Sequence, residues 1–191
     1  MADTARAFTT AISDINSPYD DFAPVIPPDG QKMYFSSKRP YEKHDDIYKS
    51  TGQYTENIYW AGKRSREWKF NGSLSKKINE KHNNAVIGLS PNGMQLLIFD
   101  GQKNNGDIYK AEYKKSKWRS PKNSKFAKIN SRARETSATI AYDNRTMYFV
   151  SNRENENSIG GQDIYRSIRS KSSKKWGKPV NAGSTLNSIY D

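Results

Sequence analysis

The apolar residues of the chain form short runs on either side of pairs of turn-forming residues. In the first such unit, the runs 22–26 and 33–35 flank an Asp-Gly pair at 29–30. An Asp-Gly or Asn-Gly pair between apolar runs is a strong signal for a β-hairpin, because these residues tolerate the positive φ angles of tight turns. The same arrangement recurs around an Asn-Gly pair at 92–93 and an Asp-Asn pair at 143–144. The pattern therefore predicts three hairpins and no long helix.

A longer motif joins these hairpins into a repeat. An Ile/Leu-Asn pair stands at 15–16, 78–79, 129–130 and 186–187. Each of the first three Asn residues precedes its turn pair by thirteen residues. An Asp/Asn-Ile-Tyr motif and then a Trp follow in each unit: 57–59 with Trp68, 107–109 with Trp118, and 163–165 with Trp176. Self-similarity with a period of about 50 residues indicates a repeat architecture, and each unit is predicted to contain four short strands.

The first unit contains a second Asp-Ile-Tyr motif, at 46–48, which competes for the role of third strand. The motif at 57–59 is preferred, because its distance to Trp68 matches the corresponding distance in the second unit. Residues 36–56 then form an enlarged loop, in which the motif at 46–48 adds a small ribbon. Turn pairs, strand-opening Asp or Asn and regularly spaced aromatics mainly report packing, so the repeat specifies fold rather than chemistry.

The predicted fold class is all-β, a β-propeller of four-stranded antiparallel blades with three blades and the start of a fourth. The expected divisions are an N-terminal outer strand at 1–14, blades at 15–77, 78–128 and 129–185, and a further blade from 186–191. Propellers close with about four to eight blades, so three leave the ring incomplete. Either the chain is a fragment of a longer propeller, which we favour, or two copies form a homodimer of about six blades. In the second case residues 8–12 would be an outer strand of the neighbouring blade.

The motifs also resemble a known family. Residues 16–24 and 28–40, the Ser-Pro-Asn-Gly turn at 90–93 and Ser-Asn-Arg at 151–153 are similar to the TolB-like, WD40-like propeller repeat. The variant they resemble occurs in OmpA-family envelope proteins of gliding, type IX-secreting bacteria. The departures are Ile-Pro-Pro at 26–28 and the third turn pair, which lacks Gly.

The resemblance covers nearly the whole chain and implies a location in the periplasm or at the cell surface. It also implies a non-enzymatic role as a scaffold or partner-binding module. The partner would be a protein of the cell envelope, in a secretion, gliding or peptidoglycan-associated assembly. The family provides no set of catalytic residues that can be transferred to this chain.

The net charge of +12 is concentrated in one part of each unit. Segments 63–77, 110–128 and 166–178 hold most of the Lys and Arg residues and surround the predicted turn between the third and fourth strands. A basic outer rim would attract anionic surfaces, such as lipid, lipopolysaccharide or peptidoglycan; charged edges that only prevent aggregation are the alternative. Nucleic acid is disfavoured, because no stacking aromatics are seen between these lysines. The candidate contact residues are Lys114, Lys115, Lys117, Arg119, Lys171, Lys174 and Lys175.

Other chemistry finds little support in the sequence. The chain has no Cys and only two His, His44 and His82, both in polar surroundings. We therefore expect no catalytic residues, no metal site and no cofactor. Two loops, 37–54 and the Asn- and Glu-rich 152–162, are expected to choose the partner, the second as a mobile loop. Within the first, the candidate binding residues are His44, Asp45 and Asp46. A glycan-binding or glycan-cleaving propeller remains the alternative function.

Overall fold

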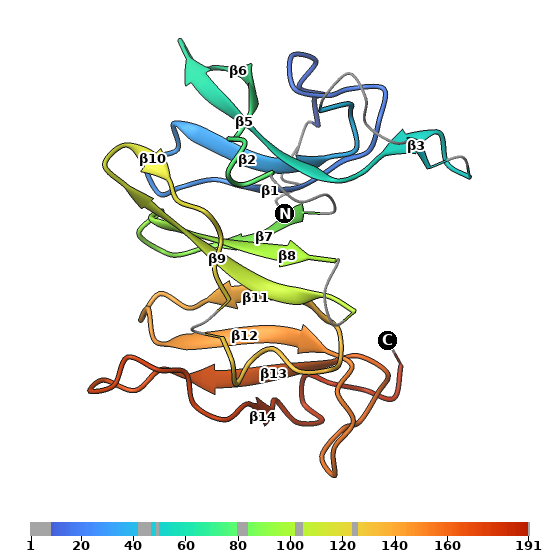
Figure 1. The fold of residues 1–191 in the computed structure, drawn as a ribbon, viewed down its shortest axis with the longest axis vertical. Helices are drawn as coiled ribbons and strands as arrows, with labels where there is room; N and C mark the ends of the chain where they lie inside the picture. The colour runs from blue at the N-terminus through green and yellow to red at the C-terminus, as the bar shows by residue number, and fades with distance from the viewer. Residues whose placement is uncertain are drawn as a thin grey trace, which may run out of the picture.

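The computed structural model describes residues 9–41, 47–48, 50–79, 84–101, 105–123 and 126–190. Within these residues the regular structure consists of β-strands, which form three four-stranded antiparallel sheets and one small ribbon. Figure 1 shows the three sheets stacked one on another, with the second between the first and the third. This all-β arrangement of propeller-like blades confirms the predicted fold class. No helix in the described residues is long and apolar enough to cross a membrane.

The first blade has the order β1-β2-β5-β6. Its strands are β1 (Asp21–Val25), β2 (Lys32–Ser37), β5 (Asn57–Arg64) and β6 (Glu67–Ser73). The third strand begins at Asn57, as predicted. The enlarged loop holds the predicted ribbon, made by β3 (Ile47–Tyr48) and β4 (Gln53–Tyr54), which pair antiparallel.

The second and third blades repeat this order. The second contains β7 (Asn84–Leu89), β8 (Gln95–Asp100), β9 (Asp107–Lys114) and β10 (Lys117–Trp118). The third contains β11 (Glu135–Ile140), β12 (Thr146–Ser151), β13 (Asp163–Ile168) and β14 (Val180–Asn181). Strand β7 packs against both β1 and β11, so the first strands of neighbouring blades lie together.

The fourth strand of the third blade differs from the expectation that Trp176 begins it. Trp176 makes only an isolated bridge to Arg169, and regular pairing resumes at Val180. Pro179 lies between these two points and has no N–H to give to a ladder. The longer turn at 170–175, with Lys174 at a φ of 57°, also separates the two strands.

The cores lie mainly between the blades. One cluster joins the first and second blades through residues that include Tyr34, Ile58, Leu96 and Trp118. Another joins the second and third blades, and Leu97, Ile108, Met147, Phe149 and Trp176 belong to it. Each blade alone would leave an apolar face exposed, so stacking is what buries the core.

The Asn of each Ile/Leu-Asn pair after the first joins a blade to the one before it. The side chain of Asn79 accepts a hydrogen bond from the N–H of Ile58 at 2.9 Å and donates one to its C=O, also at 2.9 Å. This pairing satisfies both backbone groups of a residue in the preceding blade. The same two bonds join Asn130 to Ile108 and Asn187 to Ile164. Asn16 is exposed and makes no side-chain hydrogen bond with the described residues.

The N-terminal part of the chain was predicted to be an outer strand. Residues 9–14 form no strand within the single chain, and residues 1–8 lie outside those described. Since that strand was expected to pair with a neighbouring blade, the outer strand and the homodimer both remain predictions.

Candidate binding surfaces

The Ser-x-Arg motif anchors the start of the loop between the second and third strands. In the third blade, Arg153 donates to Glu135 Oε1 at 3.0 Å and to Ser151 Oγ at 3.0 Å, and it also donates to the C=O of Ile129. Its guanidinium lies 5.1 Å from the ring centre of Tyr165. Glu135 is completely buried, so this ion pair is held away from water.

The first blade repeats this arrangement. Arg39 donates to Asp21 Oδ1 at 2.6 Å, to Ser37 Oγ and to the C=O of Ile15. Burial acts to raise the pKa of Asp21, but hydrogen bonds from Arg39, Ser37 and Ser17 outweigh it and lower that pKa. The motif therefore fixes the direction in which each loop leaves its blade.

The two predicted partner loops meet at one cavity of about 700 Å³. The first loop contributes Lys38, Ser50 and Thr51, and the second contributes Asn152. The remaining lining comes from all three blades and consists of Glu56, Phe99, Gly101, Asn105 and Arg134. The N–H of Arg134 donates to Asn152 Oδ1 at 2.7 Å, which ties the third blade's loop to this cavity.

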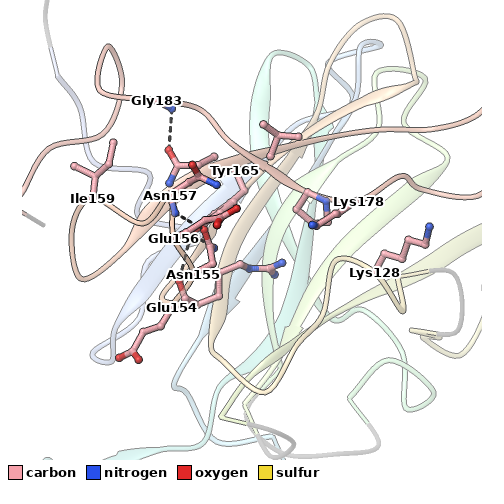
Figure 2. Close-up of a pocket in the computed structure, with 13 residues that line it drawn as sticks. Lys128, Glu154, Asn155, Glu156, Asn157, Ile159, Tyr165, Lys178 and Gly183 are labelled. Atoms are coloured by element: carbon pink, nitrogen blue, oxygen red, sulfur yellow. Dashed lines mark hydrogen bonds between the residues drawn. The ribbon is translucent and has the colours of Figure 1, made fainter.

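The second loop also borders a larger cavity of about 840 Å³ in the third blade (Figure 2). Glu154 and Glu156 from the loop and Lys128 and Lys178 from neighbouring segments give it charges of both signs. The predicted mobility of this loop stays a prediction; in the structure several hydrogen bonds hold the loop. Those within the loop and at its ends join Ser158 Oγ to Arg153 O at 2.8 Å, Asn155 Nδ2 to Tyr165 Oη at 3.1 Å, and Ile159 N to Asp163 Oδ2 at 2.7 Å.

The predicted basic residues of the second blade lie around the β9–β10 turn, where Lys115 and Ser116 have φ angles of 52° and 57°. Lys114 forms an ion pair with Glu112, which also pairs with Lys110 at 2.7 Å. Hydrogen bonds from these two lysines lower the pKa of Glu112 to about 2. Lys114 is therefore partly neutralised by its own blade.

The basic residues of the third blade lie apart from these, in the turn at 170–175. Lys171, Lys174 and Lys175 are all exposed there. The other candidates, His44, Asp45 and Asp46, lie outside the described residues, as does His82. In the part of the chain that the structure describes, no group of three His, Cys, Asp or Glu side chains could hold a metal ion.

Lys117 and Arg119 line a groove of about 540 Å³ between the first and second blades. Its aromatic lining includes Trp60, Tyr113 and Trp118. The Tyr113 and Trp118 ring centres are 5.2 Å apart. Lys32 Nζ lies 5.9 Å from the ring centre of Trp60 and 5.5 Å from that of Tyr113.

Sequence reasoning missed this groove, because its aromatics come from two blades and are far apart in the chain. The premise that no aromatics lie among the basic residues is therefore wrong for this part of the surface. A usable signal was present at one position: the strand residue after the Asp/Asn-Ile-Tyr motif is Trp60 in the first unit but Lys110 and Arg166 in the others.

Comparison with known proteins gives no match to any family model or to any curated protein. Among solved structures, TolB from Acinetobacter baumannii is 13% identical, with a TM-score of 0.47, over 83% of this chain and 32% of that one. The β-propeller domain of the Trilobed protease from Pyrococcus furiosus is 11% identical, with a TM-score of 0.50, over 87% of this chain and 44% of that one. The chain has a β-propeller fold. It spans less than half the length of either of these two structures.

Proposed function

We propose that this propeller is a non-enzymatic module that binds a protein partner through the loops between the second and third strands. The observation that carries this proposal is the cavity at which the two loops meet, lined by residues of all three blades. A site built from several blades presents a concave surface whose shape depends on the assembled propeller. Such surfaces, formed by loops on a rigid scaffold, are common positions for binding.

The charges around the two cavities suit a polar protein surface. Lys38 and Glu56 border one cavity, and Glu154, Glu156, Lys128 and Lys178 border the other. Charges of both signs can be matched by a partner with the opposite pattern, which favours specificity. The hydrogen bonds that hold loop 152–162 reduce the conformational entropy lost on binding.

We place this module in the cell envelope, in the periplasm or at the cell surface, because of the resemblance of its motifs to TolB-like envelope repeats. An assembly for secretion, gliding or peptidoglycan attachment is the setting that the same resemblance suggests.

Photo-crosslinking in intact cells tests this proposal. A photoreactive amino acid at Thr51 or at Glu156, both exposed, should capture the same protein. The matched control is Tyr142, which is 92% exposed and lies beside the turn pair between β11 and β12, at the other end of the strands. The proposal fails if Tyr142 captures that protein equally well, or if Thr51 and Glu156 capture nothing. A captured partner from the cytosol would contradict the envelope location.

A further inference from the structure

We propose that the groove between the first and second blades, at Lys32, Trp60, Tyr113, Lys117, Trp118 and Arg119, binds an anionic oligosaccharide. This site is separate from the loop cavities and does not depend on the protein partner proposed above.

The groove contains aromatic residues that the repeat itself does not require. Trp60 pairs with Tyr34 across β5 and β2. The same cross-strand position holds Lys110 in the second blade, paired with Leu97, and Arg166 in the third, paired with Tyr148. A cation on this strand is therefore compatible with the blade, so packing within the blade does not account for a Trp in the first.

Two more groove positions depart from the repeat in the same way. At the start of β2 the first blade has Lys32, whereas the second blade has Gln95 at the start of β8 and the third has Thr146 at the start of β12. In the second blade, Tyr113 packs on Trp118. The first and third blades have a cation at the position of Tyr113. Lys63 lies 5.6 Å from the ring centre of Trp68, and Arg169 lies 5.4 Å from that of Trp176. Lys32, Trp60 and Tyr113 come from two blades, yet they meet at one groove.

The charge of the groove selects an anionic ligand. Among the described residues that line it there are five basic side chains and no acidic one. Lys32, Lys77, Lys117 and Arg119 form no ion pair with any described residue. Unpaired cations in a concave site concentrate the field that attracts an anion.

The aromatic surface of the groove favours a sugar over a nucleic acid base. The ammonium of Lys32 lies over both the Trp60 and Tyr113 rings, so a base that stacked on these ring faces would have to displace it. A carboxylate or other anionic group can instead pair with that ammonium. The C–H face of a pyranose ring can pack on the exposed part of the partly buried Trp60 and Tyr113 rings, whose faces carry partial negative charge.

The shape of the groove also argues against an added peptide strand. An added strand pairs with a sheet edge, and the edge strand that borders the groove, β10, has only two residues to pair with. None of the exposed large aliphatic side chains among the described residues lines it. Its polar lining, Ser75 and Ser116, offers hydroxyl groups that can bond to sugar hydroxyls.

Titration of the protein with a pentamer of galacturonic acid, followed by calorimetry and tryptophan fluorescence, tests the proposal. The wild-type chain should bind this probe and should bind a neutral chitin pentamer more weakly. Trp60→Arg and Lys32→Thr convert the groove positions to the residues that the third blade carries there, so both variants should fold. Each should weaken binding by roughly tenfold or more.

The Trp60→Arg variant separates the proposal from simple charge attraction, because it adds a positive charge to the groove. Arg132→Thr removes one exposed positive charge outside the groove and should leave the affinity unchanged. The proposal is overturned if the wild type does not bind the pentamer, or if Trp60→Arg binds it as tightly as the wild type. It is also overturned if a hexaglutamate peptide or a thymidine oligonucleotide binds more tightly than the pentamer and loses affinity with Trp60→Arg.

Discussion

Two partly buried arginines show how single residues hold this fold together. Arg39 and Arg153 each donate to an acid and a backbone carbonyl at the start of their blade, and to a Ser hydroxyl at the end of its second strand. The second blade has Asn84 at the position of the acid, and its side chain donates to the C=O of Ile78 at 3.1 Å. In the second blade, a hydrogen bond from the side-chain amide of Asn84 thus reaches the carbonyl that the arginine reaches in the other two blades.

Arg153→Ala should lower the free energy of unfolding by about 3 kcal/mol, because it leaves the buried carboxylate of Glu135 without its cation. The side chain of Glu135 is 0% exposed, and that of Arg153 is 15% exposed. Chemical denaturation measures the loss, and Arg132→Ala, at an exposed position, is the control. Equal effects of the two variants would contradict this account of the cluster.

Glu112 should make stability depend on pH in the acid range. Its pKa is lowered from 4.5 to about 2 by hydrogen bonds from Lys110 and Lys114. A lowered pKa in the folded state stabilises the fold above the ordinary pKa, and this contribution is lost as pH falls from about 4.5 towards 2. Between pH 5 and 2, Glu112→Gln should therefore lose less stability than the wild type in thermal melts. Glu67→Gln, at a 75% exposed side chain, is the matched control. An unchanged pH dependence in Glu112→Gln would be inconsistent with this role.

At the scale of elements, the Asn residues connect one blade to the next. The sequence identified them as markers of the repeat but did not show what they bind. Their partner is the backbone of a strand about 20 residues earlier, at Ile58, Ile108 or Ile164. A backbone group carries no side-chain signature, so spacing alone could not reveal the contact. The strands themselves could be predicted, since turn pairs and alternating apolar residues act locally.

The chain contains its own control for the Asn contacts. Asn130→Ala should lower the free energy of unfolding by about 1–3 kcal/mol, because the N–H and C=O of Ile108 lose their partner. Asn16→Ala removes the same residue from the same motif where its side chain makes no hydrogen bond with the described residues, so its effect should stay within about 0.5 kcal/mol. Comparable losses in both variants would show that the contact between blades is not the cause.

At the scale of the whole molecule, the third blade exposes a face that is buried in the first blade. Tyr34 and Ile58 of the first blade are buried beneath the second blade. The third blade places Tyr148 and Ile164 at the same positions, and both are partly exposed. The face also carries Ile168, which is 48% exposed.

If two copies of the chain complete the ring, as in the alternative to a longer propeller, they should associate through this exposed face. Light scattering after size-exclusion chromatography should show an average mass that rises with concentration towards that of a dimer. Ile168→Glu should prevent the rise without changing the circular dichroism spectrum, because it places a charge in an apolar contact. A monomer at all concentrations would rule out a ring completed by two copies.

We propose that a protein partner binds the assembled propeller where loops 37–54 and 152–162 meet. Neither cavity could be predicted from the sequence, because each depends on how separate segments pack. The most direct test is the affinity of the crosslinked partner for two variants that add the same side chain at exposed positions. Thr51→Arg, at the cavity, should weaken binding by roughly tenfold or more, while Tyr142→Arg should leave it unchanged. Unchanged affinity in Thr51→Arg together with a loss in Tyr142→Arg would contradict the account.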